Sequence, residues 1–135
     1  MTDKVIPESG PLPPPSNPTE AREVLKSSAF EAPDVQVITL EATEFTALCP
    51  RTGQPDFGTV TIEYLPADLC IESKSLKYYL WSFRNEGVFC ESIAARIADD
   101  IMYAIEARAL EVEVTQNIRG GIGIVARAVR GEYQQ

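Results

Sequence analysis

The fold is set around residues 48–58, which read Leu48-Cys49-Pro50-Arg51-Thr52-Gly53-Gln54-Pro55-Asp56-Phe57-Gly58. This segment is rich in proline and glycine, and it joins two runs of alternating apolar and polar residues, at 35–48 and 59–65. Alternation with a period of two is typical of a strand with one buried face. The pattern therefore predicts an antiparallel pair of strands whose connection, residues 50–57, has a thiol at its start and a carboxylate near its end.

Two helices are predicted next. Ser73 is a favourable N-cap, and apolar residues follow it at helical spacing. Gly87 separates this helix from a second one at about residues 89–108. The second helix has an apolar stripe, and Asp100 is expected on another face, with the other charged residues.

The last part of the chain predicts a hairpin. Residues 110–115 alternate, Gly120-Gly121 is a strong turn signal, and residues 122–129 return as the partner strand. The order ββααββ predicts an α+β fold, a four-stranded antiparallel sheet with two helices on one face. A single subunit would leave its strand edges open, so a homo-oligomer is expected.

Residues 1–33 are predicted to be a proline-rich N-terminal arm, and residues 34–135 the folded domain. Prolines cluster between residues 7 and 18, and a segment with so few N–H donors is typically extended. A short helix from Thr19, as its cap, to about Lys26 is expected inside the arm.

Composition narrows the function classes. The net charge of −8 argues against direct binding to nucleic acid, and no apolar run approaches the ~20 residues of a membrane span. Three cysteines cannot all pair within the chain, which favours reduced thiols in a cytoplasmic protein. They include no CxxC pair and the chain has no histidine, so no metal site is expected.

The pair Cys49 and Asp56 could carry nucleophilic chemistry. A thiol at the end of a strand can meet a ligand while the sheet holds it in place. Without histidine, a carboxylate is the available proton acceptor, and Asp56 could take the thiol proton and later donate it. Each residue also has a simpler interpretation, Cys49 as an inert buried thiol and Asp56 as a turn residue.

The helix that opens at Ser73 could bind a phosphate. Its free N–H groups, with Lys74 and Lys77, favour an anion, and Tyr78 could pack on a flat ring. Solvated surface lysines are the alternative. Glu91 lies where the second helix begins, a favourable position for a carboxylate in any protein.

Together these spaced elements resemble the NADPH-dependent nitrile reductases of queuosine biosynthesis, the single-domain type of the tunnelling-fold superfamily. The resemblance spans roughly residues 45–131 and rests on Leu48 to Gly58, Glu72 to Tyr78 and Phe89-Cys90-Glu91. It implies a tunnelling fold, in which subunits join their sheets into a barrel, with two stacked pentameric rings as the family precedent. The family often has histidine where this chain has Cys90.

The resemblance also implies a reaction and a set of residues. Cys49 would attack the nitrile of 7-cyano-7-deazaguanine to form a covalent thioimide, Asp56 would supply a proton, and NADPH would reduce the adduct to the aminomethyl product. Substrate-binding residues would be Ile71, Glu72, Ser73, Cys90 and Glu91. Cofactor-binding residues would be Lys74, Ser75, Lys77 and Tyr78. The alternatives are an amidinotransferase that forms the same thioimide and a non-catalytic ring that binds purines.

Overall fold

The computed structural model describes residues 13–132, so the first part of the predicted arm lies outside the described residues. Four strands form an antiparallel sheet in the order β2-β3-β5-β6: β2 (Ile38–Leu48), β3 (Pro55–Leu65), β5 (Ala109–Arg119) and β6 (Ile122–Gly131). A small second sheet pairs β1 (Phe30–Glu31) with β4 (Leu69–Cys70). The predicted four-stranded antiparallel sheet is confirmed.

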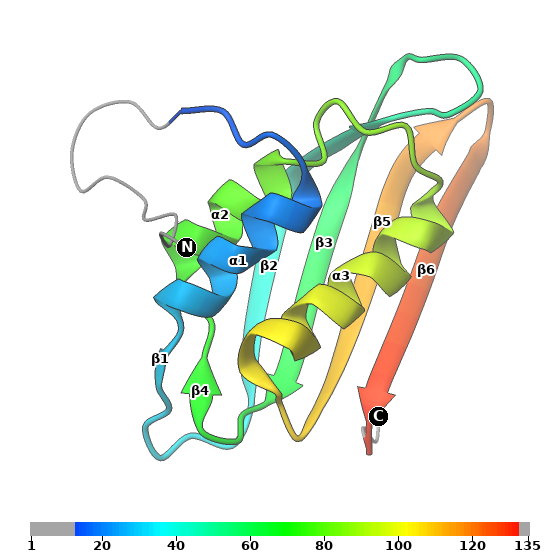
Figure 1. The fold of residues 1–135 in the computed structure, drawn as a ribbon. Helices are drawn as coiled ribbons and strands as arrows, with labels where there is room; N and C mark the ends of the chain where they lie inside the picture. The colour runs from blue at the N-terminus through cyan, green and yellow to red at the C-terminus, as the bar shows by residue number, and fades with distance from the viewer. Residues whose placement is uncertain (1–12, 133–135) are drawn as a thin grey trace.

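Three helices cover one face of the large sheet (Figure 1): α1 (Pro18–Ser28), α2 (Ser73–Trp81) and α3 (Cys90–Ile105). The apolar stripe predicted for α3 is buried against β5 and β6. The first helix packs on the other two and buries Ala21, Val24 and Leu25. The sequence predicted two helices on this face, which are α2 and α3, and the structure adds α1 as a third.

The N-terminal helix begins earlier than predicted. Asn17, not Thr19, is its N-cap, because the Asn17 side chain accepts a hydrogen bond from the Glu20 N–H at 2.9 Å. Proline stands at its first position, where a missing N–H costs no helical hydrogen bond. The proline that indicated an extended arm therefore also starts a helix of the core.

Asp100 is buried, and its predicted place on an exposed face of α3 is wrong. Its side chain is 1% exposed because partners from all three helices enclose it. Arg96 Nε donates to Oδ2 at 2.9 Å, Arg22 Nη1 donates to Oδ1 at 3.2 Å, and the Tyr79 hydroxyl donates to Oδ2 at 2.5 Å. This network fixes α1 and α2 against α3, since each helix supplies one partner or more.

The predicted hairpin at the C-terminal end is confirmed. Gly120 and Gly121 connect β5 to β6 with φ angles of +58° and +80°, values that favour glycine. The pairing shifts register between Gln116 and Arg119, where β5 bulges. None of the helices in the part of the chain that the structure describes is long and apolar enough to cross a membrane.

Candidate active site

Three connections meet at one end of the sheet: the β2–β3 loop, the α2–α3 segment and the β5–β6 turn (Figure 1). Backbone hydrogen bonds hold the first two together, from Leu48 N to Glu86 O at 2.9 Å and from Val88 N to Leu48 O at 3.1 Å. The thiol of the first connection and the start of α3 therefore belong to one region. Four of the predicted site residues lie in this region, Cys49, Asp56, Cys90 and Glu91, and those between Ile71 and Tyr78 lie in α2 or just before it.

The loop that holds Cys49 is tighter than predicted. It spans only residues 49–54, because Cys49 N donates to Gln54 O and Gly53 N donates to Cys49 O, both at 2.8 Å. The Thr52 hydroxyl, the N–H groups of Thr52 and Arg51, and the Arg119 side chain hydrogen-bond to the sulfur. These donors lower the Cys49 pKa from its ordinary value of 9.0 to about 7, and the Thr52 hydroxyl has the largest effect. Burial raises the pKa by a smaller amount.

A thiol with this pKa is about half ionised at neutral pH. The sequence alone indicated a few per cent of thiolate, because its only reference was the free side chain. The interpretation of Cys49 as an inert buried thiol does not fit a half-buried sulfur that accepts several hydrogen bonds.

Asp56 belongs to a strand, not to the loop where the sequence pattern placed it. It is the second residue of β3 and pairs with Ala47 on β2. Its side chain is 12% exposed, and Arg119 Nη1 lies 2.6 Å from its Oδ1 in an ion pair. That oxygen is buried, and no residue among 13–132 donates a hydrogen bond to it.

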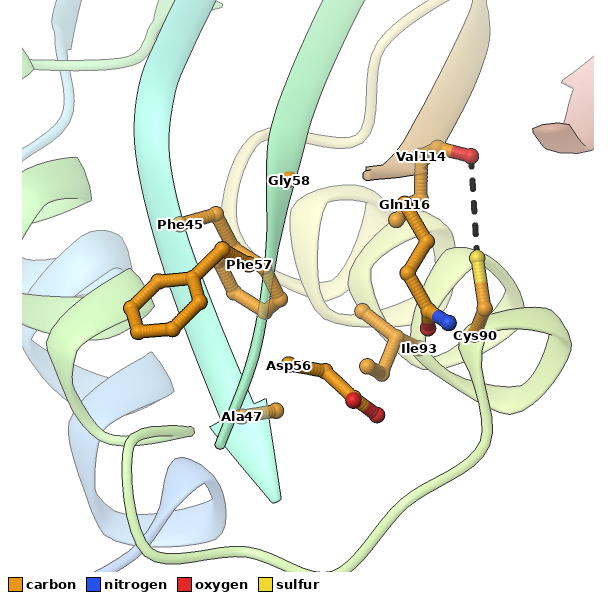
Figure 2. Close-up of a pocket in the computed structure, with 9 residues that line it drawn as sticks. All are labelled: Phe45, Ala47, Asp56, Phe57, Gly58, Cys90, Ile93, Val114 and Gln116. Carbon is orange, nitrogen blue, oxygen red and sulfur yellow. Dashed lines mark hydrogen bonds between the residues drawn. The ribbon is translucent and has the colours of Figure 1, made fainter. Parts of the chain in front are cut away.

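Asp56 and Cys90 line the same small pocket between the sheet and α3 (Figure 2). Seven other residues complete the lining: Phe45, Ala47, Phe57, Gly58, Ile93, Val114 and Gln116. The Cys90 thiol donates to Val114 O at 3.7 Å, and burial raises its pKa. A protonated, hydrogen-bonded thiol is a poor nucleophile, so Cys90 shapes the pocket wall.

A larger groove of about 1070 Å³ runs between α2 and β2. Ser73, Lys77 and Tyr78, all predicted ligand-binding residues, line its helix side together with Trp81 and Arg84. Phe45 and Phe57 line both the groove and the pocket, so the two cavities adjoin. The groove therefore borders the pocket that Asp56 lines.

The start of α2 differs from the prediction. Glu72, not Ser73, is the N-cap: its carboxylate accepts from Lys74 N at 2.7 Å and from Ser75 N at 2.9 Å. These N–H groups are therefore already engaged, which removes the helix N-terminus as a phosphate site. Ser75 is fully buried, and its hydroxyl donates to Glu72 O at 2.8 Å. Ser73 and one side of α2 line the groove, but the first N–H groups of the helix are occupied by Glu72.

The remaining predicted residues lie apart from both cavities. Ile71 is buried, and its N–H donates to the Tyr64 hydroxyl at 3.0 Å. Lys74 is exposed and does not line the groove. Glu91 is exposed in the first turn of α3, next to Cys90 but outside the pocket lining. Within one chain, the structure does not bring Ile71, Glu72 or Glu91 to the pocket.

Sequence reasoning missed Arg119. It treated the Gly-Gly pair that follows only as a turn, yet this arginine forms an ion pair with Asp56 and makes a small contribution to the lowered pKa of Cys49. The available signal was a lone arginine beside a predicted hairpin turn at the end of a strand. Without the sheet order, nothing in the pattern places that turn beside the β2–β3 loop.

Comparison with known proteins gives a consistent family. The family model described as "QueF-like protein" matches residues 55–135. A relative from Anaeromyxobacter sp. (strain Fw109-5) is 48% identical, and the match covers 85% of this chain and 95% of the relative. A second relative, from Anaeromyxobacter sp. (strain K), is 53% identical, and the match covers 70% of this chain and 78% of the relative. Both are named NADPH-dependent 7-cyano-7-deazaguanine reductase. A relative from Chlorobaculum tepidum has the same name and is 54% identical, over 58% of this chain and 68% of the relative.

A solved structure has the same fold. The archaeosine synthase QueF-Like in its apo form aligns with a TM-score of 0.70 and 19% sequence identity. The alignment covers 76% of this chain and all of that one. The predicted tunnelling-fold subunit is therefore confirmed as a fold, while the low identity leaves the reaction to be argued from the site.

Proposed function

Because the chain belongs to the QueF-like family, with relatives about half identical that are named NADPH-dependent 7-cyano-7-deazaguanine reductases, we propose that it reduces the nitrile of 7-cyano-7-deazaguanine to the aminomethyl group. The observation that carries the proposal is Cys49, a thiol with its pKa lowered to about 7 in a chain without histidine. This thiolate can attack a nitrile carbon without help from a neighbouring imidazole base. The pathway is queuosine biosynthesis, in the cytoplasm.

The first chemical step is covalent capture by Cys49. Its thiolate attacks the nitrile carbon, an S–C bond forms, and one C–N π bond breaks as its electron pair moves to nitrogen. Asp56, which takes the proton from the Cys49 thiol, passes it to this nitrogen, which leaves a thioimide. Capture converts an inert triple bond into a C=N bond that accepts hydride, and so divides one difficult step into easier ones.

The residues that line the groove between α2 and β2 support NADPH binding there. Lys77 and Arg84 provide exposed positive charge for phosphate, and Tyr78 and Trp81 provide ring surface for a flat group. Bound there, the cofactor would supply the two hydride equivalents that the reduction of a nitrile to an amine requires. Ser73 stays in this proposed site, whereas Lys74 and Ser75 lie outside the groove lining.

The substrate base would lie at the mouth of the pocket that Asp56 and Cys90 share, since the pocket within one chain holds only about 10 Å³, with the nitrile toward Cys49. Glu91 would bind the guanine-like edge, whose adjacent N–H donors suit two carboxylate oxygens. In one chain Glu91 is exposed and is not part of the lining, so the proposed homo-oligomer would complete the pocket. The open edges of β2 and β6 and the exposed Val125 and Val129 support such an assembly.

The test uses purified protein, the nitrile and NADPH. We expect NADPH absorbance to fall only when the nitrile is present, with two NADPH consumed per amine formed. Without NADPH, intact mass should increase by one nitrile per chain, and Cys49→Ala should abolish both signals. An adduct without NADPH consumption would favour the amidinotransferase, and the absence of both adduct and turnover would favour a binding ring.

A further inference from the structure

Helix α2 has two sides with different surroundings. One side carries Lys77, Tyr78 and Trp81, which line the groove proposed for NADPH. Tyr79 lies among these residues in the sequence, yet its side chain is fully buried and is not part of the lining of the groove or the pocket. The proposed reaction gives this tyrosine no task, so its polar hydroxyl in the core needs another explanation.

The Tyr79 hydroxyl donates to Asp100 Oδ2 on α3 at 2.5 Å. Burial and the negative charge of Asp100 raise the pKa of Tyr79 well above its ordinary value of 10.0, so the hydroxyl stays protonated and remains a donor. Among residues 13–132, α2 packs on α1 and β2, whereas α3 packs on α1, β5 and β6. The hydrogen bond is therefore a direct link between two helices that are otherwise joined mainly through α1.

The ring of Tyr79 also connects to the cavities. It packs edge-on against Phe83 with ring centroids 5.4 Å apart, and Phe83 packs against Phe45 with centroids 5.7 Å apart. Phe83 is buried in the core, and Phe45 lines both the groove and the pocket. A row of three rings therefore leads from Asp100 to the wall that the two cavities share.

We propose that Tyr79 is a positioning residue for the cofactor: the hydrogen bond from its hydroxyl to Asp100 holds α2 in the orientation in which its basic and aromatic side chains line the groove. The inference rests on the proposed function for the identity of the cofactor. Tyr79 touches neither NADPH nor the nitrile. Without the bond, α2 takes up other orientations as well, and the apparent affinity of the groove falls with the fraction of chains that keep the competent one.

The test removes only the hydroxyl. Tyr79→Phe keeps the ring that packs on Phe83, and Asp100 stays paired because Arg96 and Arg22 still donate to it. We expect the KM for NADPH to rise roughly 3–10-fold, while adduct formation with the nitrile alone stays within about twofold of wild type. A hydroxyl that only stabilised the fold would reduce the amount of active protein, which lowers the measured rate and leaves KM unchanged.

Tyr103→Phe is the matched control. The Tyr103 hydroxyl also donates to a carboxylate, Glu23 Oε2 at 2.7 Å, but this bond joins α3 to α1 and does not involve α2. Its removal should leave the KM for NADPH unchanged.

A second measurement needs no ligand. Trp81 is the single tryptophan of the chain, and it is half-buried where it lines the groove. Quenching of its fluorescence by acrylamide reports how exposed that wall is. The quenching constant should be higher in Tyr79→Phe than in wild type and unchanged in Tyr103→Phe.

An unchanged KM for NADPH, or an unchanged quenching constant, in Tyr79→Phe would overturn the proposal. So would an equal rise of KM in both variants, since the cause would then be a general loosening of the helices. A Tyr79→Phe protein that does not fold would also overturn it, because the hydroxyl would then serve the fold. If wild-type protein consumes no NADPH in the presence of the nitrile, the proposed function fails instead, and Trp81 quenching still decides whether Tyr79 orients the groove.

Discussion

Replacing Thr52 by valine should make Cys49 less reactive at neutral pH and more reactive in alkali. The Thr52 hydroxyl is the strongest of the hydrogen-bond donors that lower the Cys49 pKa to about 7, and valine removes it while nearly preserving shape. The N–H groups of Thr52 and Arg51 remain, so only part of the two-unit difference from 9.0 should be lost. A rise of roughly one unit is a reasonable expectation for one hydrogen bond to a thiolate.

The magnitude follows from the ionised fraction. A thiol of pKa about 7 is about half thiolate at pH 7, and a thiol one unit higher is roughly one tenth thiolate, so alkylation at pH 7 should slow about fivefold. The sign reverses above both pKa values. There both proteins are ionised, and the more basic thiolate is intrinsically the better nucleophile by roughly threefold. The two pH–rate curves should therefore cross.

The assay is iodoacetamide alkylation from pH 5.5 to 10, with modification of Cys49 read by peptide mapping. Thr52→Ser keeps the hydroxyl and serves as the matched control, whose curve should follow wild type. Parallel curves for Thr52→Val and wild type, with no change in midpoint, would refute the assignment of the hydroxyl. A lower plateau in alkali would indicate restricted access to the sulfur instead of a change in its pKa.

Three further predictions concern other parts of the structure. Cys90→Ser should keep most turnover and still form one adduct, on Cys49, because serine can donate to the same carbonyl; peptide mapping that finds the adduct at position 90 would contradict this. Lys77→Ala should raise the KM for NADPH ~2–5-fold and leave that for the nitrile unchanged, whereas Lys74→Ala outside the groove should change neither; steady-state kinetics measures both. Asp100→Ala should lower the free energy of unfolding by about 3–5 kcal/mol, measured by urea at fixed protein concentration, and a loss below 1 kcal/mol would contradict a buried hub.

The sequence correctly predicted the elements that depend only on residues close together in the chain. The hairpin at Gly120-Gly121 was predictable because a two-residue turn with two positive φ angles demands glycine-like residues. The buried face of α3 was predictable because its apolar spacing matches one side of a helix. Cys49 was also predictable as a loop thiol, but the lowering of its pKa was not, since that depends on how the loop folds back over the sulfur.

The errors have equally specific causes. Pro55 suggested that the loop continues to residue 57, but proline is acceptable at the first position of a strand, and β5 begins to pair with β3 only at Gly58. Glu72 and Ser73 can both cap a helix. Glu72 is the N-cap because its carboxylate accepts hydrogen bonds from two N–H groups, where a hydroxyl would accept one. Asp100 looked like a surface charge because its partner Arg22 lies in a short predicted helix of the N-terminal arm, and nothing in the sequence places that helix against α3.

The placement of Arg119 depends on two long-range features that no local pattern contains. The first is the sheet order, which sets β5 next to β3, with Gly58 opposite Gln116. The second is the β5 bulge between Gln116 and Arg119, since an extra residue in a strand changes the direction of the side chains beyond it. A straight β5 would alternate from Gln116, and a shift of one residue would send the guanidinium to the opposite face of the sheet. The bulge is therefore part of the site, because it determines whether the Arg119 guanidinium reaches Asp56.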